Sequence, residues 1–292
     1  MQIGVTFPQT EIGNDPDLIK RFARTAEESG FSFVMPYDHV IGADVSTRTD
    51  WRGPYTSETP FHEVFVLFGF LAAHTNLELV TGVLILPQRQ AVLVAKQAAE
   101  IDLLTGGRFR LGVGIGWNEV EYQALGMDFR NRARRYEEQI EVMRLLWTED
   151  VVTFKGRYHE IDAAGILPRP VQRPIPVWMG GGATPAVLER IGRLADGWIA
   201  NAALSVNLDE RIADIGAAAE RAGRDPAAIG IQTMALLQKG DKGDDVDGLR
   251  RQIDAARERD LSHLTVLTMG QGRTPEEHVD AVHAAGAALR AG

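Results

Sequence analysis

The chain has no cysteine among its 292 residues. This absence excludes disulfide bonds, thiolate nucleophiles and cysteine-ligated metal sites, and it agrees with a reducing compartment. Any redox chemistry would therefore depend on a bound cofactor.

Positive charge is also scarce. The chain has 31 Lys and Arg side chains against 40 Asp and Glu, which gives a formal net charge of −9. A net negative charge favours solubility and argues against non-specific binding to nucleic acid or to anionic lipid. We therefore expect a small-molecule substrate, with neither nucleic acid nor membrane as a partner.

Long apolar runs are missing as well. No stretch reaches the roughly 18 apolar residues of a membrane span, and the start "MQIGVTFPQ" is typical of a strand and lacks the basic region of a signal peptide. We expect a cytoplasmic protein. The composition is 45% hydrophobic and no linker interrupts it, so we expect one domain over residues 1–292.

Apolar runs rich in β-branched residues recur eight times, with helical spacing between them. Continuous apolar strands are typical of a parallel sheet that is buried on both faces. Eight βα units favour a closed (β/α)8 TIM barrel of the α/β class over an open doubly wound sheet, with the reacting site at the carboxyl ends of the strands. The runs are residues 3–7, 31–35, 77–86, 109–116, 175–179, 197–200, 229–237 and 263–267.

Two segments interrupt this alternation of strands and helices. Residues 151–174 contain short extended pieces and several prolines, which predicts an insertion before strand five in the form of a hairpin that packs over the rim. Residues 42–60 form a second long loop with Trp51 and Tyr55. This loop is either a lid or substrate wall, or a poorly ordered connector.

A run of three glycines follows the predicted fifth strand in "MGGGATP". Thr184 is the expected N-cap of the next helix and Pro185 its first residue. Exposed backbone N–H groups at the positive end of a helix can bind a phosphate, although a tight turn alone would also need glycine. No Lys-Ser/Thr pair follows, so the motif is not a P-loop.

Glycines also occur within two other predicted strands. Gly112 and Gly114 begin a dinucleotide fingerprint, but Trp117 stands at the third glycine position, so a Rossmann site is disfavoured. They allow either a flat ligand to approach the backbone or small residues to pack in the barrel. Gly82 inside the third strand indicates a bulge or a close approach.

The second predicted strand ends in a Tyr-Asp-His triplet. Asp38 and His39 could form an acid–base pair or a structural pair, since a nearby carboxylate tunes an imidazole that titrates near neutrality. Neighbouring residues of an extended chain point to opposite sides, so separate roles are also possible. Glu119 and Glu121 could be an acid pair, but we expect solvated charges at a helix start.

Metal ligands are sparsely distributed along the chain. His62-Glu63 lacks the second histidine of a zinc-binding helix, and His159-Glu160 stands alone in the insertion. We expect no metal site.

Together these motifs resemble the luciferase-like monooxygenase superfamily, and most closely its F420-dependent oxidoreductase branch. The matching stretches are "YDHV", "TGVLILPQRQAVLVAKQAAEIDLLTGGRFRLGVGIGWNEVEY", "RPVQRPIPVWMGGG" and "ADGW", which span most of residues 1–200. The resemblance implies hydride transfer between the deazaflavin F420 and a small organic substrate. An FMN-dependent monooxygenase or reductase is the alternative, and a flavin-binding protein without turnover is a second one.

The resemblance also implies roles for single residues. It places a non-prolyl cis peptide at Gly82-Val83 behind the deazaflavin ring, Asp38 toward that ring and His39 toward the substrate as the active-site histidine. Trp117 replaces the glutamate of sugar-phosphate-oxidising relatives, so the proton donor and the direction of hydride transfer stay open. Barrels of this kind often pair, so we expect a homodimer. The other implied cofactor-binding residues are Gly116, Trp117, Gly180, Gly181, Gly182, Ala183 and Thr184.

Overall fold

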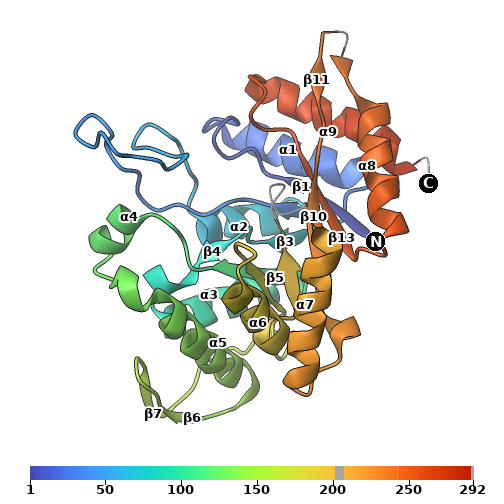
Figure 1. Cartoon of the computed structure of the whole chain (residues 1–292). Helices are drawn as coiled ribbons and strands as arrows, with labels where there is room; N and C mark the ends of the chain where they lie inside the picture. Colours follow the sequence, from blue (N-terminus) through green and yellow to red (C-terminus); the bar gives the residue numbers. More distant parts are fainter. Residues whose placement is uncertain (201–206, 242, 291–292) are drawn as a thin grey trace.

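A computed structural model describes residues 1–200, 207–241 and 243–290 of the chain. Its central strands are β1 (Gln2–Thr6), β2 (Phe33–Met35), β3 (Glu78–Val80), β4 (Leu84–Ile85), β5 (Phe109–Gly114), β8 (Val177–Gly180), β9 (Gly197–Ile199), β10 (Gly230–Leu236) and β13 (His263–Leu267). They pair in the order β3-β2-β1-β13-β10-β9-β8-β5-β4, and a β3–β5 pairing closes the ring (Figure 1). The predicted eight-position parallel TIM barrel is confirmed, because β3 and β4 share one strand position.

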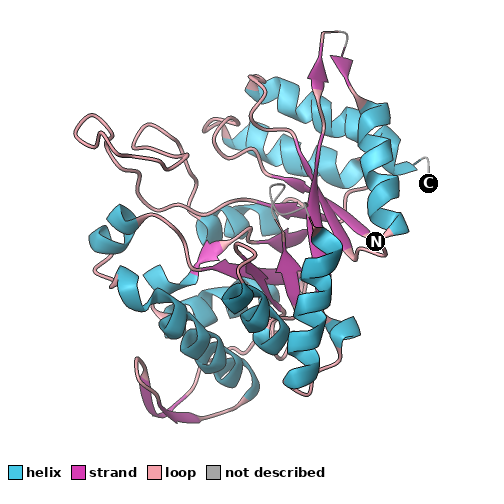
Figure 2. Cartoon of the chain, viewed as in Figure 1, coloured by secondary structure: helices cyan, strands magenta, loops and turns pink. Residues whose placement is uncertain are grey.

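Helices surround the strands on the outside of the barrel (Figure 2). α1 begins after Asp15, whose side chain accepts a hydrogen bond from the Asp17 N–H, and it buries one apolar face against the barrel. No helix in the described ranges combines the length and the apolarity needed to cross a membrane. The helices are α1 (Pro16–Glu28), α2 (Val64–Ala72), α3 (Ala91–Thr105), α4 (Glu119–Ala124), α5 (Arg132–Thr148), α6 (Pro185–Leu194), α7 (Leu208–Arg221), α8 (Val246–Glu258) and α9 (Pro275–Arg290).

The third strand position is interrupted between β3 and β4. The Gly82-Val83 peptide bond there is cis, as the resemblance implies, and the predicted bulge is confirmed. A Cβ atom on Gly82 would lie 2.4 Å from Cγ of Met35, so only glycine fits against β2. The Thr81 hydroxyl donates a 2.6 Å hydrogen bond to the carbonyl of Gly112 and anchors the break to β5.

The insertion forms the predicted hairpin, of β6 (Val152–Lys155) and β7 (Glu160–Ala164). Its predicted position over the rim is wrong: the hairpin lies along α5 on the outside of the barrel (Figure 1). The reason is Glu138 on α5, whose carboxylate accepts hydrogen bonds from the backbone N–H groups of Arg157, Tyr158 and His159 at 2.7 to 2.8 Å. A second small hairpin pairs β11 (Lys239–Gly240) with β12 (Gly243–Asp244).

A buried arginine fills the amino-terminal end of the barrel. Arg110 donates two hydrogen bonds to the Glu78 carboxylate, at 3.1 and 3.2 Å, and one to Oε1 of Gln232 at 2.8 Å. Its guanidinium carbon lies 4.3 Å from the ring centre of Trp178 and 4.9 Å from that of Phe33. These side chains form the barrel floor, which leaves the carboxyl ends of the strands, the rim, as the end open to a ligand.

Candidate active site

The segment between β2 and α2 lies over the rim, next to α4 (Figure 1). Within it the Ser57 N–H donates a 2.9 Å hydrogen bond to the carbonyl of Ala43, which folds the loop back on itself. Tyr55 and Phe61 turn their rings onto His39. Residues 42–60 are therefore not a poorly ordered connector. They form part of a wall around the histidine.

Asp38 is almost fully buried at the end of β2, with 3% of its surface exposed. Its carboxylate accepts hydrogen bonds from the Ile85 N–H at 2.9 Å and from Arg89 at 2.7 Å. Burial raises the pKa of Asp38, and Arg89 and the Ile85 N–H offset only part of this rise. Both carboxylate oxygens are therefore engaged with the segment around β4, and the implied role of Asp38 toward the cofactor stays a prediction.

His39 faces the other way, so the two neighbours have separate partners. Its Nδ1 lies 3.4 Å from Oε2 of Glu121, and ring centres of Tyr55 and Phe61 both lie 4.8 Å from its own. Its Nε2 forms no hydrogen bond with any described residue. Because His39 lines a cavity of about 290 Å³ together with Tyr55, Phe61 and Asn118, this second nitrogen is the one available to a ligand.

Glu121 is the main functional candidate that the sequence analysis missed. We expected a solvated charge, but the residue is 1% exposed and its carboxylate accepts hydrogen bonds from the Val40 N–H at 2.5 Å and from Gln88 at 3.0 Å. α4 presents this side chain to backbone amides that need an acceptor. The sequence did hold one signal for this burial. Glu121 precedes the aromatic Tyr122, and consecutive helical residues point only about 100° apart, so a buried Tyr122 brings Glu121 near the buried face. Glu119 is exposed, as expected.

The environment of Glu121 favours its charged form. Burial alone would raise the pKa of this carboxyl, but the contacts with His39, the Val40 N–H and Gln88 outweigh burial and hold the pKa below its ordinary value. An ionised Glu121, with Oε2 3.4 Å from Nδ1 of His39, fixes the orientation of the imidazole.

An apolar platform lies at the mouth of the barrel. Val83 projects between β5 and β8: a Cβ atom on Gly114 or Gly180 would come within 2.6 or 2.7 Å of its methyl groups. Val83, Tyr37 and Met234 remain partly exposed while they pack on the buried interior cluster. These three side chains, the mouth platform, present partly exposed apolar atoms that a ring could contact.

The two glycines of β5 can now be explained. A Cβ atom on Gly112 would lie 2.0 Å from the carbonyl oxygen of Thr81, and one on Gly114 would overlap Val83. The group that approaches these glycines is therefore the protein's own interrupted third strand. Packing of small residues, and not a ligand, explains them.

The glycine run after β8 is open to solvent. α6 begins at Pro185 with Thr184 as its N-cap, as predicted, and the Thr184 side chain forms no capping hydrogen bond. A Cβ atom on Gly182 would have no neighbouring heavy atom within 4 Å in the described part of the chain. Unshielded amides of Gly181, Gly182 and Ala183 at a helix start suit a phosphate group.

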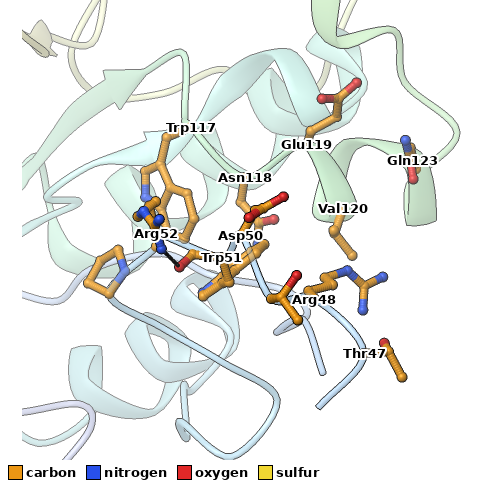
Figure 3. Close-up of a pocket in the computed structure, with 13 residues that line it drawn as sticks. Thr47, Arg48, Asp50, Trp51, Arg52, Trp117, Asn118, Glu119, Val120 and Gln123 are labelled. Carbon is orange, nitrogen blue, oxygen red and sulfur yellow. Dashed lines mark hydrogen bonds between the residues drawn. The ribbon is translucent and has the colours of Figure 1, made fainter. Parts of the chain in front are cut away.

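Gly116 and Trp117 follow the carboxyl end of β5. Gly116 has a φ of 65°, and a Cβ atom there would lie 2.7 Å from Ile85, so glycine is required. The Trp117 ring lies 5.7 Å from that of His39 and 5.5 Å from that of Trp51. Trp117 thus separates the histidine from a second cavity of about 850 Å³ (Figure 3).

No cluster of three or more His, Asp or Glu side chains in the described ranges is arranged to hold a metal ion. The structure brings the predicted groups together in two pairs: His39 lies beside Trp117, and Val83 of the cis peptide lies against Gly180 at the start of the glycine run. This combination suits an organic ligand with a flat ring and a phosphate.

The fold places the chain in the class of (β/α)8 barrels. A solved F420-dependent secondary alcohol dehydrogenase, in complex with an F420-acetone adduct, has the same fold, with a TM-score of 0.80 at 20% identity over 99% of each chain. The model of the family described as "Luciferase-like monooxygenase" matches residues 1–254. The chain belongs to the luciferase-like monooxygenase family, which confirms the predicted family.

Of two similar proteins, one is uncharacterized and the other is an FMNH(2)-dependent enzyme. An uncharacterized protein of Mycobacterium tuberculosis is 36% identical over 242 residues, which cover 80% of each chain. The FMNH(2)-dependent dimethylsulfone monooxygenase of Pseudomonas putida is 28% identical over 227 residues, which cover 77% of this chain and 59% of that protein. The similar proteins therefore include both F420-dependent and FMNH(2)-dependent enzymes.

Proposed function

We propose that residues 1–292 form one barrel domain that acts as an F420-dependent oxidoreductase on a small organic substrate. The observation that carries this proposal is His39, whose Nδ1 is held by the buried Glu121 while its Nε2 is free at the rim. F420, when bound, would supply or accept a hydride at its deazaflavin ring.

The chain's own residues would position such a cofactor. The amides of Gly181, Gly182 and Ala183, with the start of α6, would bind its phosphate. Val83 and the rest of the mouth platform would support one face of the ring. Asp38 would act on the ring through the β4 segment, which it fixes by its hydrogen bond to Ile85.

His39 would handle the proton that accompanies the hydride. Nε2 would give this proton to the substrate oxygen during reduction, or take it during oxidation. The carboxylate of Glu121 would stabilise the imidazolium form, and Trp117, Tyr55 and Phe61 would keep water away from it. Trp117 stands where sugar-phosphate-oxidising relatives have a glutamate, so His39 would be the proton donor here, and Glu121 would only position it.

Turnover of an F420-loaded variant tests this role. Panels of small alcohols with F420, and of carbonyl compounds and activated alkenes with reduced F420, are scored by the visible absorbance of oxidised F420. We expect His39→Ala to lower turnover by about 100-fold or more while it retains F420 affinity, since positioned proton transfer contributes about this much. Unchanged turnover would refute the assignment, and binding without any turnover would favour a flavin-binding protein.

An FMN-dependent monooxygenase or reductase is the second candidate function. It is supported by the 28% identity with the FMNH(2)-dependent enzyme of Pseudomonas putida. A flavin reacts with oxygen whereas a deazaflavin transfers hydrides, so oxygen consumption by the FMN-loaded protein with a flavin reductase would favour this candidate.

We also propose that the chain forms a homodimer through α2. This helix is apolar on nearly all sides, and Val66 on its outer face is 74% exposed. A helix that is hydrophobic all round is typical of a buried environment. Light scattering should give twice the chain mass for the wild type and the single chain mass for Val66→Glu; a monomeric wild type would refute the pairing.

A further inference from the structure

A third cavity lies between α3, α5 and the insertion, on the outer side of the barrel. It has a volume of about 590 Å³ and is lined by residues 90–93, Lys96, Arg135, Tyr158, His159 and Ile166. It shares no lining residue with the cavities at His39 and behind Trp117. Figure 1 shows α3, α5 and the hairpin together on one side of the molecule. The size of this cavity suits a small organic ligand.

The wall of this third cavity is largely apolar. Val92 and Leu93, in the first turn of α3, are 44% and 52% exposed. Tyr158 and Ile166 line the cavity from the insertion. Apolar side chains that remain exposed inside a concave surface favour a ligand whose apolar part removes them from water.

The charges that line the cavity are positive. They belong to Lys96 of α3 and Arg135 of α5, and no Asp or Glu of the described residues lines it. Glu138 contacts the cavity residue His159, but its carboxylate is already engaged by the His159 ring and by the N–H groups of the hairpin. The cavity is therefore complementary to an anion that carries an apolar group.

Arg135 has no partner for its charge. It is partly buried, yet it forms no hydrogen bond or ion pair with any residue that the structure describes. Its nitrogen atoms are not enclosed, because none of them belongs to the buried polar atoms that lack a partner. Burial lowers the pKa of Arg135 more than Tyr122 and Asp128 raise it, and a guanidinium still keeps its charge. A bound anion would compensate for the water that this group has lost.

Lys96 adds a second positive charge to the same wall. Its Nζ donates a 2.8 Å hydrogen bond to the carbonyl of Leu167 in the insertion. An ammonium group has three donor hydrogens, so two of them remain for other acceptors. Lys96 thus holds the insertion against α3 and also contributes positive charge to the cavity.

We propose that this cavity binds a monocarboxylate with an apolar chain, whose carboxylate pairs with Arg135 and whose chain lies against Val92 and Leu93. The two oxygens of a carboxylate match the paired N–H groups of a guanidinium. The aliphatic side chains of the wall suit an alkyl chain. This site lies apart from His39, so the inference goes beyond the proposed function and does not rest on it.

The test compares octanoate with octanamide, which has the same chain but no charge. Calorimetric titration of the full chain should show that octanoate binds at least about tenfold more tightly than octanamide, because a hydrogen bond to a charged group contributes this much. Acetate, which keeps the charge but lacks the chain, should also bind at least about tenfold more weakly than octanoate.

Two arginines on α5 provide the variant and its control. Arg135→Gln removes the charge and should abolish the preference for octanoate over octanamide. Arg134→Gln changes the exposed neighbouring arginine, which does not line this cavity, and should bind octanoate like the wild type. Leu93→Ser should weaken octanoate and octanamide to the same extent, since it removes a contact with the chain only. Circular dichroism of each variant confirms folding before titration.

Three results of these titrations would overturn the inference. They are equal binding of octanoate and octanamide to the wild type, no binding of octanoate, and a preference for octanoate that survives Arg135→Gln. A repeat titration with saturating F420 separates the cavity from the cofactor site. Octanoate should bind with unchanged affinity; competition with F420 would assign the cavity to the cofactor and would also overturn the inference.

Discussion

Polar side chains at the floor and at the rim of the barrel differ in their hydrogen bonding. At the floor, the three guanidinium nitrogens of Arg110 all have partners, in Glu78 and Gln232. At the rim, His39 is only partly buried, lines a cavity of about 290 Å³, and its Nε2 forms no hydrogen bond with a described residue. A satisfied buried network stabilises the fold, whereas a polar atom left free beside a cavity is available to a ligand. The comparison therefore assigns stability to the floor and function to the rim.

The largest expected effect is the loss of folding stability when Arg110 at the barrel floor is replaced. Arg110→Met leaves Glu78 and Gln232 without their partner and should lower the free energy of unfolding by about 3 kcal/mol, as removal of one member of a buried ion pair does. Urea unfolding followed by circular dichroism measures this change. The matched rim variant His39→Ala should lose less, because Nε2 of His39 has no partner that would be left unpaired; equal losses would show that the rim contributes as much to stability as the floor.

Glu121→Gln tests whether the rim carboxylate serves the histidine. We expect turnover to fall about tenfold, because a neutral amide stabilises the imidazolium less than an ionised carboxylate does. The KM for substrate should stay close to the wild-type value, since Glu121 lies behind His39. Glu119→Gln, an exposed change on the same helix, is the control. A raised KM with unchanged turnover would contradict this assignment and indicate a structural role for Glu121.

A negative charge introduced into the glycine loop tests whether this loop binds the phosphate of F420. Gly182→Glu should weaken F420 binding by about tenfold, because a carboxylate repels a phosphate a few ångströms away. The control Gly216→Glu places the same charge on α7, where the nearest heavy atom to an added Cβ lies 3.6 Å away. Unchanged affinity in Gly182→Glu would exclude this loop as the phosphate site.

The smallest expected effect is on the pH dependence of stability. The pKa of Glu121 is lower in the folded chain than its ordinary value of 4.5. Its contribution to the unfolding free energy is therefore complete above pH 4.5 and is lost as the pH falls through the folded-state pKa. Wild type should exceed Glu121→Gln by more at pH 7 than at pH 3; a constant difference would contradict this sign.

Local patterns in the sequence predicted the barrel and the glycine loop. Eight apolar runs with helices between them define a parallel barrel, and Thr184-Pro185 marks a helix start by its own chemistry. The break at Gly82 was also visible as a glycine within a strand. These features depend on residues close together in the chain, so the sequence alone is sufficient.

Features that depend on distant residues could not be predicted. Glu121 is buried because Val40 and Gln88 need an acceptor there, and Arg110 is buried because Glu78 and Gln232 meet it across the barrel. A charge in a strand or in a first helical turn usually indicates solvent. The position of the insertion hairpin likewise depends on residues distant in the chain, among them the carboxylate of Glu138.

The central claim is that the rim binds F420, and a parallel titration tests it most directly. The cofactor-free protein is titrated with F420, FMN and NADPH under identical conditions, with binding followed by quenching of its tryptophan fluorescence. The account predicts that F420 binds at least tenfold more tightly than either competitor, and that Gly182→Glu weakens this binding. Tighter binding of FMN, or no binding of F420, would contradict it.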